Sequence, residues 1–521
     1  MIITPDSIVR LLKVNLEIDE NNQIKFASKQ EQLDYFNSLP YIEQEKLQYI
    51  RKDNILYFPE NIEKLYEYNY VMYKNTNYSD KWFFAYITDM KYNNDNMTEI
   101  SIKTDSWQTW QFDITFKQSF IEREHVNNDT VGLHTVPENV ELGDYTLYNT
   151  HSDYDGIGSC HVVMGSTVNP ATGQNVAGDD YSGIYSGISY YVFTSIDYLN
   201  RAIKNLAELS KSDAITTLFI APDNLTKFTK ISWIITEGSG SGETISYGLI
   251  ETGKDPVTLK DYEFTRPNNF NGYVPKNNKL LCFPYNFFNL TNNVGENGIY
   301  HYEDFSSANI KFKVYGSITP SCSIRAIPTN YKGTELWSEG ISVGKFPQCS
   351  WNTDTYTNWL TQNGVNLGLG IAGSAISIGA SAISGNPIGL ASGILGVAQS
   401  IGSVYEHSLL PPTAEGNINN GDITYSKGKN TLSFLPIQIR REFAEIIDGW
   451  FSMYGYKVNK LKLPNLTGRR NWNFIKTINA NIEAYIPQSD LQNIKEMFNK
   501  GITLWHNVNT FLDYSQNNDI I

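Results

Sequence analysis

The first 126 residues alternate apolar and polar side chains with the two-residue period of β-strands. Aromatic and β-branched residues gather in short runs, and polar turns such as NTNYSD separate the runs. This pattern predicts strands. They are expected at NILYF (54–58), YNYVMY (68–73), WFFAYIT (82–88), EISIK (99–103) and QFDITF (111–116).

From about Val126 to about Pro275 the composition shifts to Gly, Asn, Asp and Thr, which predicts a separate, inserted domain. Within it, Ser195 is a candidate N-cap. Apolar residues follow that cap at helical spacing, at Leu199, Ala202, Ile203, Leu206 and Leu209. KISWIIT (230–236) predicts a strand that ends in the flexible turn EGSGSGE.

Strand patterns return after Pro275, in LLCFPYNFF (280–288), IKFKVYGSI (310–318), CSIRAI (322–327), FLPIQIR (434–440), YKVNKLKLPN (456–465) and NIEAYI (481–486). One helix is predicted by a single apolar face, made of Phe443, Ile446, Ile447, Trp450, Phe451 and Tyr454. A last helix is expected to begin with Ser489 as its cap and to end at Gly501. The pattern as a whole predicts a mainly β fold with some α, of the α+β class.

The stretch between Asp354 and Glu406 carries no Asp, Glu, Lys or Arg. Gly385-Asn386-Pro387 divides it into two arms, 367–384 and 388–404, each near the shortest length of helix that crosses a hydrocarbon core. Small residues recur every four positions, which is the spacing that lets membrane helices approach closely. They are Gly373, Ser377 and Ser381 in the first arm, and Ser392, Gly396 and Ser400 in the second.

The free energy of inserting one copy of this apolar segment into a membrane is expected to be only marginally favourable. In water, each glycine inside a helix costs about 1 kcal/mol relative to Ala. In lipid, an unpaired backbone group costs several kcal/mol, so the chain is driven to form a helix or a closed barrel, in which these groups are paired. The Leu and Ile residues of the first arm favour insertion by only about 3 kcal/mol. Many copies side by side could insert together.

The alternatives to membrane insertion are a buried helical hairpin and a mobile plug or linker. A buried hairpin is disfavoured because the segment has few polar residues for the outer face of such helices. A linker is disfavoured because Gly/Ser linkers do not normally contain so many Ile, Leu and Val residues.

The net charge, the N-terminus and the cysteines limit the classes of function that the chain can have. A net charge of −14 argues against tight nucleic-acid binding but is compatible with a passage through which DNA slides. The N-terminus has no signal-peptide pattern, which predicts synthesis in a cytoplasm. The cysteines, Cys160, Cys282, Cys322 and Cys349, form no CxxC pair, so buried free thiols are expected rather than a metal site or disulfides.

No motif predicts catalysis. ETISYGLIE follows the glycines of GSGSG (238–242) and alternates like a strand, whereas a dinucleotide site needs a helix there. EREH (122–125) is strand-like, so its two carboxylates should share a face, and a solvated face is expected. GxSxG, HExxH and Walker A sequences are absent. The chain is therefore expected to be non-enzymatic, with no cofactor, no metal site and no catalytic residue.

Several long motifs resemble the tail knob, or distal tail tube, proteins of small short-tailed bacteriophages of the Salasmaviridae and Rountreeviridae type. The resemblance is carried by WFFAYIT (82–88), DSWQTWQFDITFKQSFIEREHV (105–126), KLLCFPYNFF (279–288), MYGYKVNKLKLPN (453–465) and GITLWH (501–506). The apolar segment lies in the family's order, between the third of these blocks and the C-terminal ones. The resemblance covers about two thirds of the chain, and 127–275 share little with the best-known members.

The resemblance implies β-barrel-like tube domains, an inserted knob domain and a homohexameric tube at the tip of the virion tail. It implies contacts with upper tail or collar proteins, with genomic DNA in the lumen and with the host cytoplasmic membrane. The apolar loops of the family are thought to plug the tube and then to form a membrane pore. By position, the loop residues here are Leu367, Leu369, Ile371, Ile376, Ile378, Ile383, Gly385, Pro387, Ile388, Leu390, Ile394, Leu395, Val397, Ile401 and Val404.

The expected division of the chain follows from these patterns and the resemblance. The tube domain comprises 1–126, 276–362 and 413–521, the knob domain 127–275, and the apolar loop 363–412. Two alternative functions remain open: a pore-forming or channel protein unrelated to phage tails, and a tail-associated cell-wall hydrolase.

Overall fold

The computed structural model describes residues 7–516 except 48, 51–53, 76–80, 149–151, 156–159, 179, 182–183, 186, 194, 212–213, 223–224, 227–230, 251–256, 293–295, 318–322, 333–339, 346–347, 351–415, 418–423 and 426–430. Two compact units make up the chain. Unit 1 comprises 1–143, 272–280 and 441–521, and unit 2 comprises 144–271 and 281–440. The chain therefore passes between the units four times.

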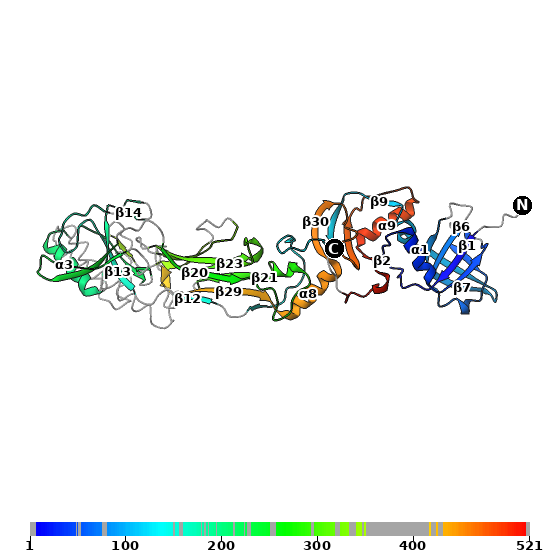
Figure 1. The fold of residues 1–521 in the computed structure, drawn as a ribbon, viewed down its shortest axis with the longest axis horizontal. Coiled ribbons are helices and arrows are strands. Elements are labelled where there is room, and N and C mark those ends of the chain that lie inside the picture. Colours follow the sequence, from blue (N-terminus) through cyan, green and yellow to red (C-terminus); the bar gives the residue numbers. More distant parts are fainter. Residues whose placement is uncertain are drawn as a thin grey trace. The chain divides into compact units, whose positions relative to one another are not determined.

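Unit 1 begins with a seven-stranded antiparallel sheet in the order β3-β1-β6-β7-β8-β5-β4. The strands are β1 (Ser7–Leu12), β3 (Tyr41–Glu45), β4 (Tyr49–Ile50), β5 (Ile55–Phe58), β6 (Tyr70–Asn75), β7 (Phe83–Asn94) and β8 (Met97–Thr104). The two-residue period buries both faces, because Val71 joins one apolar cluster and its neighbours Tyr70 and Met72 join the other. Helix α1 (Lys29–Ser38) is drawn beside this sheet in Figure 1. It contributes Phe36 to the second cluster, where the Phe36 ring stacks on that of Tyr70.

The second sheet of unit 1 has five strands in the order β2-β33-β31-β10-β30, with β2 parallel to β33. Its strands are β2 (Asn22–Ile24), β10 (Ser119–Glu124), β30 (Tyr456–Lys462), β31 (Trp472–Ile478) and β33 (Ile502–Trp505). Helices α2 (Ser106–Trp110) and α9 (Gln488–Lys500) cover one face, where Trp107 contacts Phe498. The unit also contains helix α8 (Arg441–Tyr454), the strand pair β9 (Ile114–Phe116) and β32 (Ile482–Ala484), and the 3-10 turns η1 (Ile62–Lys64) and η6 (Val508–Thr510).

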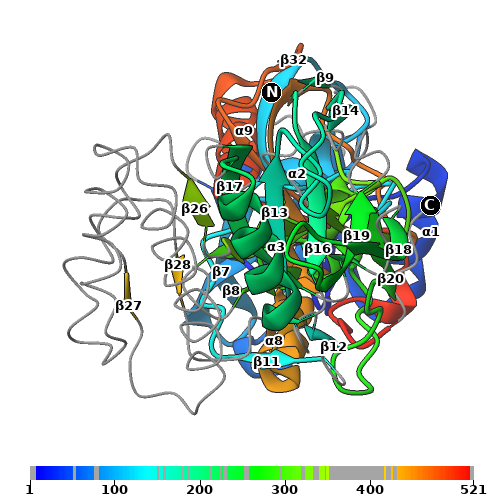
Figure 2. The ribbon, with the colours of Figure 1, turned by 90° about the vertical axis from the view of Figure 1, so that its left-hand side faces the viewer.

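Unit 2 contains a six-stranded antiparallel sheet in the order β18-β19-β16-β13-β17-β26. The strands are β13 (Cys160–Ser166), β16 (Ser189–Phe193), β17 (Ile215–Pro222), β18 (Ile231–Gly238), β19 (Thr244–Ile250) and β26 (Gln348–Ser350). Helix α3 (Ile196–Glu208) lies across this sheet, as Figure 2 shows. Val162 and Met164 face α3, while Val163 points into the core on the other face.

Two further sheets of unit 2 complete that core. One has the order β11-β29-β21-β22, with β12 also pairing with β29, and the other has the order β20-β23-β24-β25. Their strands are β11 (Tyr145–Leu147), β12 (Ser152–Asp155), β20 (Val257–Thr265), β21 (Asn286–Thr291), β22 (Asn297–His301), β23 (Asn309–Ser317), β24 (Ser323–Pro328), β25 (Ile341–Lys345) and β29 (Thr431–Ile439). The described residues of unit 2 also form two small ladders, β14 (Asp180–Tyr181) with β15 (Ile184–Tyr185) and β27 (Gly416–Asn417) with β28 (Thr424–Tyr425), and the 3-10 turn η4 (Tyr302–Asp304). The 3-10 turn η3 (Asn278–Leu281) lies at a boundary between the units.

The prediction of a mainly β fold with some α is confirmed. Strands β5 to β8 lie where the N-terminal pattern placed them, and α3 begins at its predicted cap, because the Ser195 hydroxyl accepts a hydrogen bond from the backbone N–H of Tyr198. The EGSGSGE segment joins β18 to β19 as a hairpin, so GSGSG opens no helix.

Three local predictions are wrong. Ile446 was placed on the buried face of α8, but its side chain is 69% exposed and Ala444 is buried instead. Helix α9 begins after Pro487, so Ser489 lies inside the helix and does not cap it, although Gly501 does end it with φ 101°. The first part of LLCFPYNFF forms η3, and the strand begins only at Asn286.

Candidate functional site

The predicted loop residues, Leu367 to Val404, lie outside the described part of the chain. The structure does show the strands on either side of them. Among the described residues, no helix combines the length and the apolar character that crossing a membrane requires. The described residues that bear on the apolar segment are those that precede and follow it.

The chain enters the segment from β26, at the edge of the six-stranded sheet. β26 pairs antiparallel with β17, and its last residue, Ser350, is the partner of Thr217. On the far side, the ladder of β27 and β28 contacts β25, and β29 follows. Both ends of the segment thus belong to unit 2.

The returning strand β29 is central in its sheet and deeply packed. It pairs with β21 along one edge and with β11 and β12 along the other. The Phe434 side chain is fully buried, and its ring centroid lies 4.4 Å from that of Tyr262 and 5.6 Å from that of Phe312. Because that core also takes residues from β13, β16 and β17, both sheets that hold the ends of the segment pack on one core.

The EREH segment forms the end of β10 in unit 1, and its expected solvated face is wrong. Glu124 is fully buried and pairs with Lys462, while Glu122, one third exposed, pairs with Lys476 at 3.0 Å. A bulge between Ile121 and Arg123 breaks the simple alternation that placed both carboxylates on one face. Both carboxylates are neutralised by lysines, which supports a structural role.

Arg123 and Glu138 form the centre of a buried ionic cluster beside this strand. Glu138 accepts hydrogen bonds from the Arg123 guanidinium, the Lys279 ammonium and the backbone N–H of Lys457. Only 1% of the Glu138 side chain is exposed. The guanidinium of Arg123 also lies 3.9 Å from the ring centroid of Trp450. One carboxylate therefore connects all three chain segments that make up unit 1.

His125, the last residue of EREH, is also structural. Its Nδ1 accepts a hydrogen bond from the backbone N–H of Phe474 at 2.7 Å, which leaves Nε2 to donate to the carbonyl of Ser452 at 3.1 Å. Burial, and then the charge of Arg469, hold the pKa of His125 well below its usual range. A neutral ring with both nitrogens engaged has no free atom for proton transfer.

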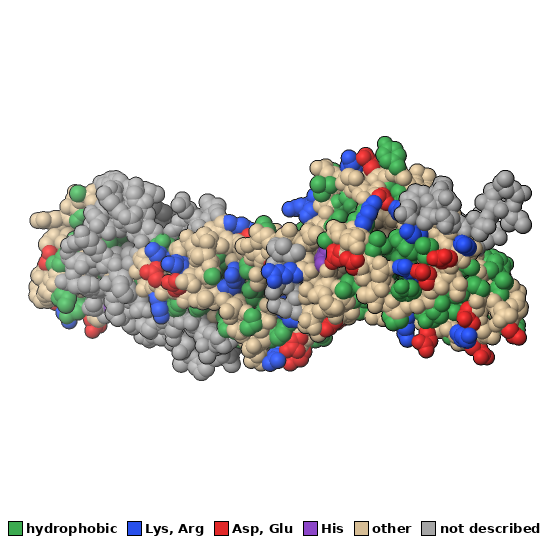
Figure 3. Space-filling view, turned by 45° about the vertical axis from the view of Figure 1, so that its right-hand side comes forward, with side chains coloured by type: hydrophobic (Ala, Val, Ile, Leu, Met, Phe, Trp, Pro, Cys, Tyr) green, Lys and Arg blue, Asp and Glu red, His purple; other side chains and the backbone are tan. Residues whose placement is uncertain are grey.

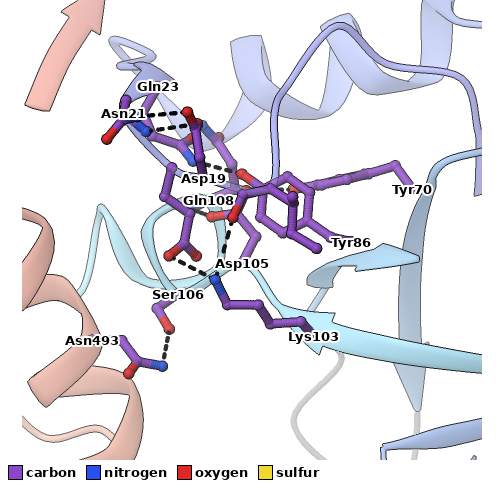
Figure 4. A network of polar contacts seen from close by, with 12 residues as sticks. Asp19, Asn21, Gln23, Tyr70, Tyr86, Lys103, Asp105, Ser106, Gln108 and Asn493 are labelled. Carbon is purple, nitrogen blue, oxygen red and sulfur yellow. Dashed lines mark hydrogen bonds and ion pairs between the residues drawn. The ribbon is translucent and has the colours of Figure 1, made fainter. Parts of the chain in front are cut away.

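A second polar network, which the sequence did not single out, surrounds Asp105 at the start of α2 (Figure 4). The buried carboxylate accepts from the Tyr70 hydroxyl and from the backbone N–H of Gln108, both at 2.9 Å. Gln108 in turn donates to Gln23, which donates to the Tyr86 hydroxyl. Burial raises the pKa of Asp105 to about 6.

Raised carboxyl pKa values often mark active sites, but Asp105 has the geometry of a structural residue. It is the N-cap of α2, and it does not line the neighbouring cleft of about 120 Å³, whose wall includes Glu20, Lys103 and Asn493. Glu20 and Lys103 pair at 2.9 Å. The sequence pattern DSWQTW carried one usable signal, an Asp three residues before the N–H that it caps.

Within the described ranges, no group of three or more His, Cys, Asp or Glu side chains is placed to hold a metal ion. Cys282 is buried and belongs to no disulfide among the described residues. On the face drawn in Figure 3, acidic and basic side chains are interspersed.

Comparisons with known proteins agree with one another. Residues 254–519 match the family model of the C-terminal domain of tail knob protein gp9 from Bacillus phage phi29, and residues 6–117 match that of the N-terminus of caudoviral major tail proteins. Tail knob proteins gp9 of Bacillus phages phi29 and PZA are 24% and 25% identical to the chain, each with 98% of both chains covered. The solved tail knob protein gp12 of bacteriophage C1 has a similar fold, with a TM-score of 0.59 at 14% identity over 97% of this chain and 98% of that one.

Proposed function

The chain belongs to the phi29 gp9-type family of phage tail knob proteins, and from this premise we propose that it assembles into a hexameric conduit for DNA whose apolar segments first plug the lumen and then enter the host cytoplasmic membrane. It is a structural component of a bacteriophage tail. Because its relatives are structural tail proteins, we infer that it is not an enzyme.

The observation that carries the proposal is the uncharged stretch between Asp354 and Glu406. A conduit that delivers DNA must be closed before infection and must open a path through lipid afterwards. A segment that inserts only marginally as one copy suits both states, because several copies together gain what a single copy lacks. A net charge of −14 would also limit adhesion of DNA to the wall.

The remaining roles are assigned by sequence position. We infer a tube domain from 1–126, 276–362 and 413–521 and a knob domain from 127–275, with upper tail or collar proteins as neighbours. The two compact units divide nearby, at 143/144 and 271/272, but unit 2 also takes in 281–440.

Dye release from liposomes tests the membrane step. The full chain is compared with a variant lacking 364–404, at neutral and mildly acidic pH. Leakage that disappears with the deletion is the expected result, and both proteins must show the same assembled mass. Leakage that persists in the deletion variant would assign membrane entry to another part of the chain.

A substitution pair refines this test. Ile378→Asp together with Ile394→Asp places one carboxylate in each arm, which opposes insertion by about 3 kcal/mol per site, so leakage should be lost. Ile378→Val together with Ile394→Val is the matched control and should retain it. Equal leakage from both variants would contradict insertion of the arms.

A further inference from the structure

Three basic side chains form a row across the five-stranded sheet of unit 1. Arg123 of β10 is the register partner of both Lys457 on β30 and Lys476 on β31. All three side chains line one open cavity of about 310 Å³, so they share a face of the sheet. Like charges directly opposite one another on neighbouring strands destabilise a sheet. The row therefore needs negative charge in the cavity that it lines.

The rest of the cavity combines an aromatic wall with carboxylates. Trp450 and Tyr454 of α8, both half-buried, form the wall, with ring centroids 5.8 Å apart. The bulge in β10 brings Glu122 into the same lining, which Glu138 and Asn139 complete. A volume near 310 Å³ lies at the lower end of the range of small-molecule sites. The cavity thus has the size and the mixed lining of a site for a small polar ligand.

One of the two carboxylates is already shared between cations. Glu138 accepts hydrogen bonds from the Arg123 guanidinium and the Lys279 ammonium, and its side chain is only 1% exposed. The backbone N–H of Lys457 donates to the same carboxylate, but the Lys457 ammonium has no ion-pair partner among the described residues. Glu138 therefore balances the charge of only one of the three cations beside it.

The other carboxylate belongs to a weak ion pair. Glu122 and Lys476 lie 3.0 Å apart, and about one third of each side chain is exposed. Exposed pairs contribute little to stability, so the Lys476 ammonium can turn towards a ligand at little cost. In this cluster two carboxylates face four cations, which leaves an excess of two positive charges.

We propose that this cavity binds a small phosphate monoester. The phosphate lies between the ammonium groups of Lys457 and Lys476, and the organic group packs against the ring of Trp450. A monoester carries close to two negative charges at neutral pH, which matches the excess, whereas a carboxylate carries one. The two lysines stand on the strands that flank β10, about 10 Å apart at the backbone, and their long flexible stems let both ammonium groups reach one phosphate. The apolar segment plays no part in this site, so the inference goes beyond the proposed conduit and does not depend on it.

Isothermal titration calorimetry with the full chain tests the charge requirement. Glucose 6-phosphate should bind, gluconate, which carries one charge, should bind more weakly, and glucose should not bind. Lys457→Gln should weaken the binding of glucose 6-phosphate by about tenfold, because a hydrogen bond to a charged group is lost. Lys460→Gln is the matched control, since it removes the same charge from the same strand outside the cavity, and it should bind as the wild type does.

Tryptophan fluorescence locates the ligand. Glucose 6-phosphate should change the emission of the wild-type chain, and Trp450→Phe should abolish that change while calorimetry still detects binding. Equal affinity of Lys457→Gln and the wild type would overturn the site, provided that both unfold at the same temperature. A fluorescence change that survives in Trp450→Phe, or a folded wild-type chain that does not bind glucose 6-phosphate, would also overturn it.

Discussion

Unit 1 and unit 2 differ in the kind of polar side chain that each one buries. In the described part of the chain, every charged or histidine residue that is buried as a whole, backbone included, belongs to unit 1, namely Asp105, Arg123, Glu124, His125, Lys279, Asp448, Arg469 and Asp490. The side chain of Glu138, also in unit 1, is only 1% exposed. The buried polar residues of unit 2 are uncharged, such as Asn286 and Gln438, and its core is aromatic and aliphatic.

The difference follows from how each unit is assembled. Unit 1 is made of three chain segments that are far apart in sequence, and buried ions join them. Glu138 connects Arg123, Lys279 and the backbone of Lys457, while Asp448 accepts from the N–H groups of Lys276 and Asn277. A buried carboxylate tolerates few substitute partners, so these contacts select the correct segments, whereas the aromatic packing of unit 2 depends mainly on volume.

The largest effect is expected from Glu138→Ala. The substitution leaves Arg123 and Lys279 buried without their counter-charge, which should lower the free energy of unfolding of unit 1 by about 3–5 kcal/mol. Hydrogen exchange resolved by peptide would report the two units separately. Glu141→Ala, at an exposed position nearby, should change little. Equal loss of protection in both units would contradict a contrast between them.

The next effect is the pH dependence contributed by Asp105. Its pKa is raised to about 6 in the folded chain and is near 3.9 in an unfolded one. Between these values the folded state binds more protons, so this group's contribution to stability is largest below about pH 4 and falls as the pH rises through 6. Burying the charge costs unit 1 about 3 kcal/mol at neutral pH.

Asp105→Asn removes the pH-dependent contribution of Asp105 to the stability of unit 1 while keeping the size of the side chain. The measurement is the change in unfolding free energy between pH 4.5 and 7.5, for the variant and the wild type side by side. His125 opposes the trend, because its lowered pKa makes the folded state lose stability as the pH falls below about 6.5. Only the difference between the two proteins therefore isolates Asp105, and identical profiles would refute its assigned pKa.

A smaller effect is expected in the core of unit 2. Phe434→Leu keeps most of the apolar volume and should cost about 1 kcal/mol, with no dependence on pH. Denaturant unfolding at two pH values measures both quantities. A loss as large as that of Glu138→Ala would show that unit 2 is packed as specifically as unit 1.

The smallest effect is expected at an exposed ion pair of unit 1. Lys117 and Glu483 lie 3.1 Å apart with 46% and 68% of their side chains exposed. Glu483→Gln should change the free energy of unfolding by less than about 0.5 kcal/mol, and added salt should remove even that. The comparison with Glu138→Ala then separates burial from charge as the cause.

The sequence predicted the elements whose signals are local. Period-two alternation placed β5 to β8, and Ser195 marked the start of α3. The burial of EREH could not be predicted, because the lysines that pair with its carboxylates, Lys462 and Lys476, come from a distant segment and a bulge shifts the strand. Ile446 was misplaced because helical spacing alone does not say how wide the buried face is.

For the apolar segment, in contrast to EREH, the informative features are local in the sequence, but the function depends on the assembly. Its lack of charge and its spaced glycines and serines are visible in the sequence, and the resemblance to tail knob proteins gave it a role. What the segment does in a membrane depends on how many copies act together, which is a property of the assembly and not of one chain. Membrane entry therefore stays a prediction for the dye-release experiment.

The two tethers of the apolar segment in unit 2 also limit how far the segment can extend from that unit. Residues 351–415 number 65, and β26 and the β27–β28 ladder fix the two ends. A chain tethered at both ends can travel out and back over at most half its contour length, about 110 Å for this number of residues. That limit is several times the hydrocarbon thickness of a bilayer. This length is therefore compatible with the proposed membrane entry while both tethers stay paired, and a single proteolytic cut between the tethers would leave two free ends in its place.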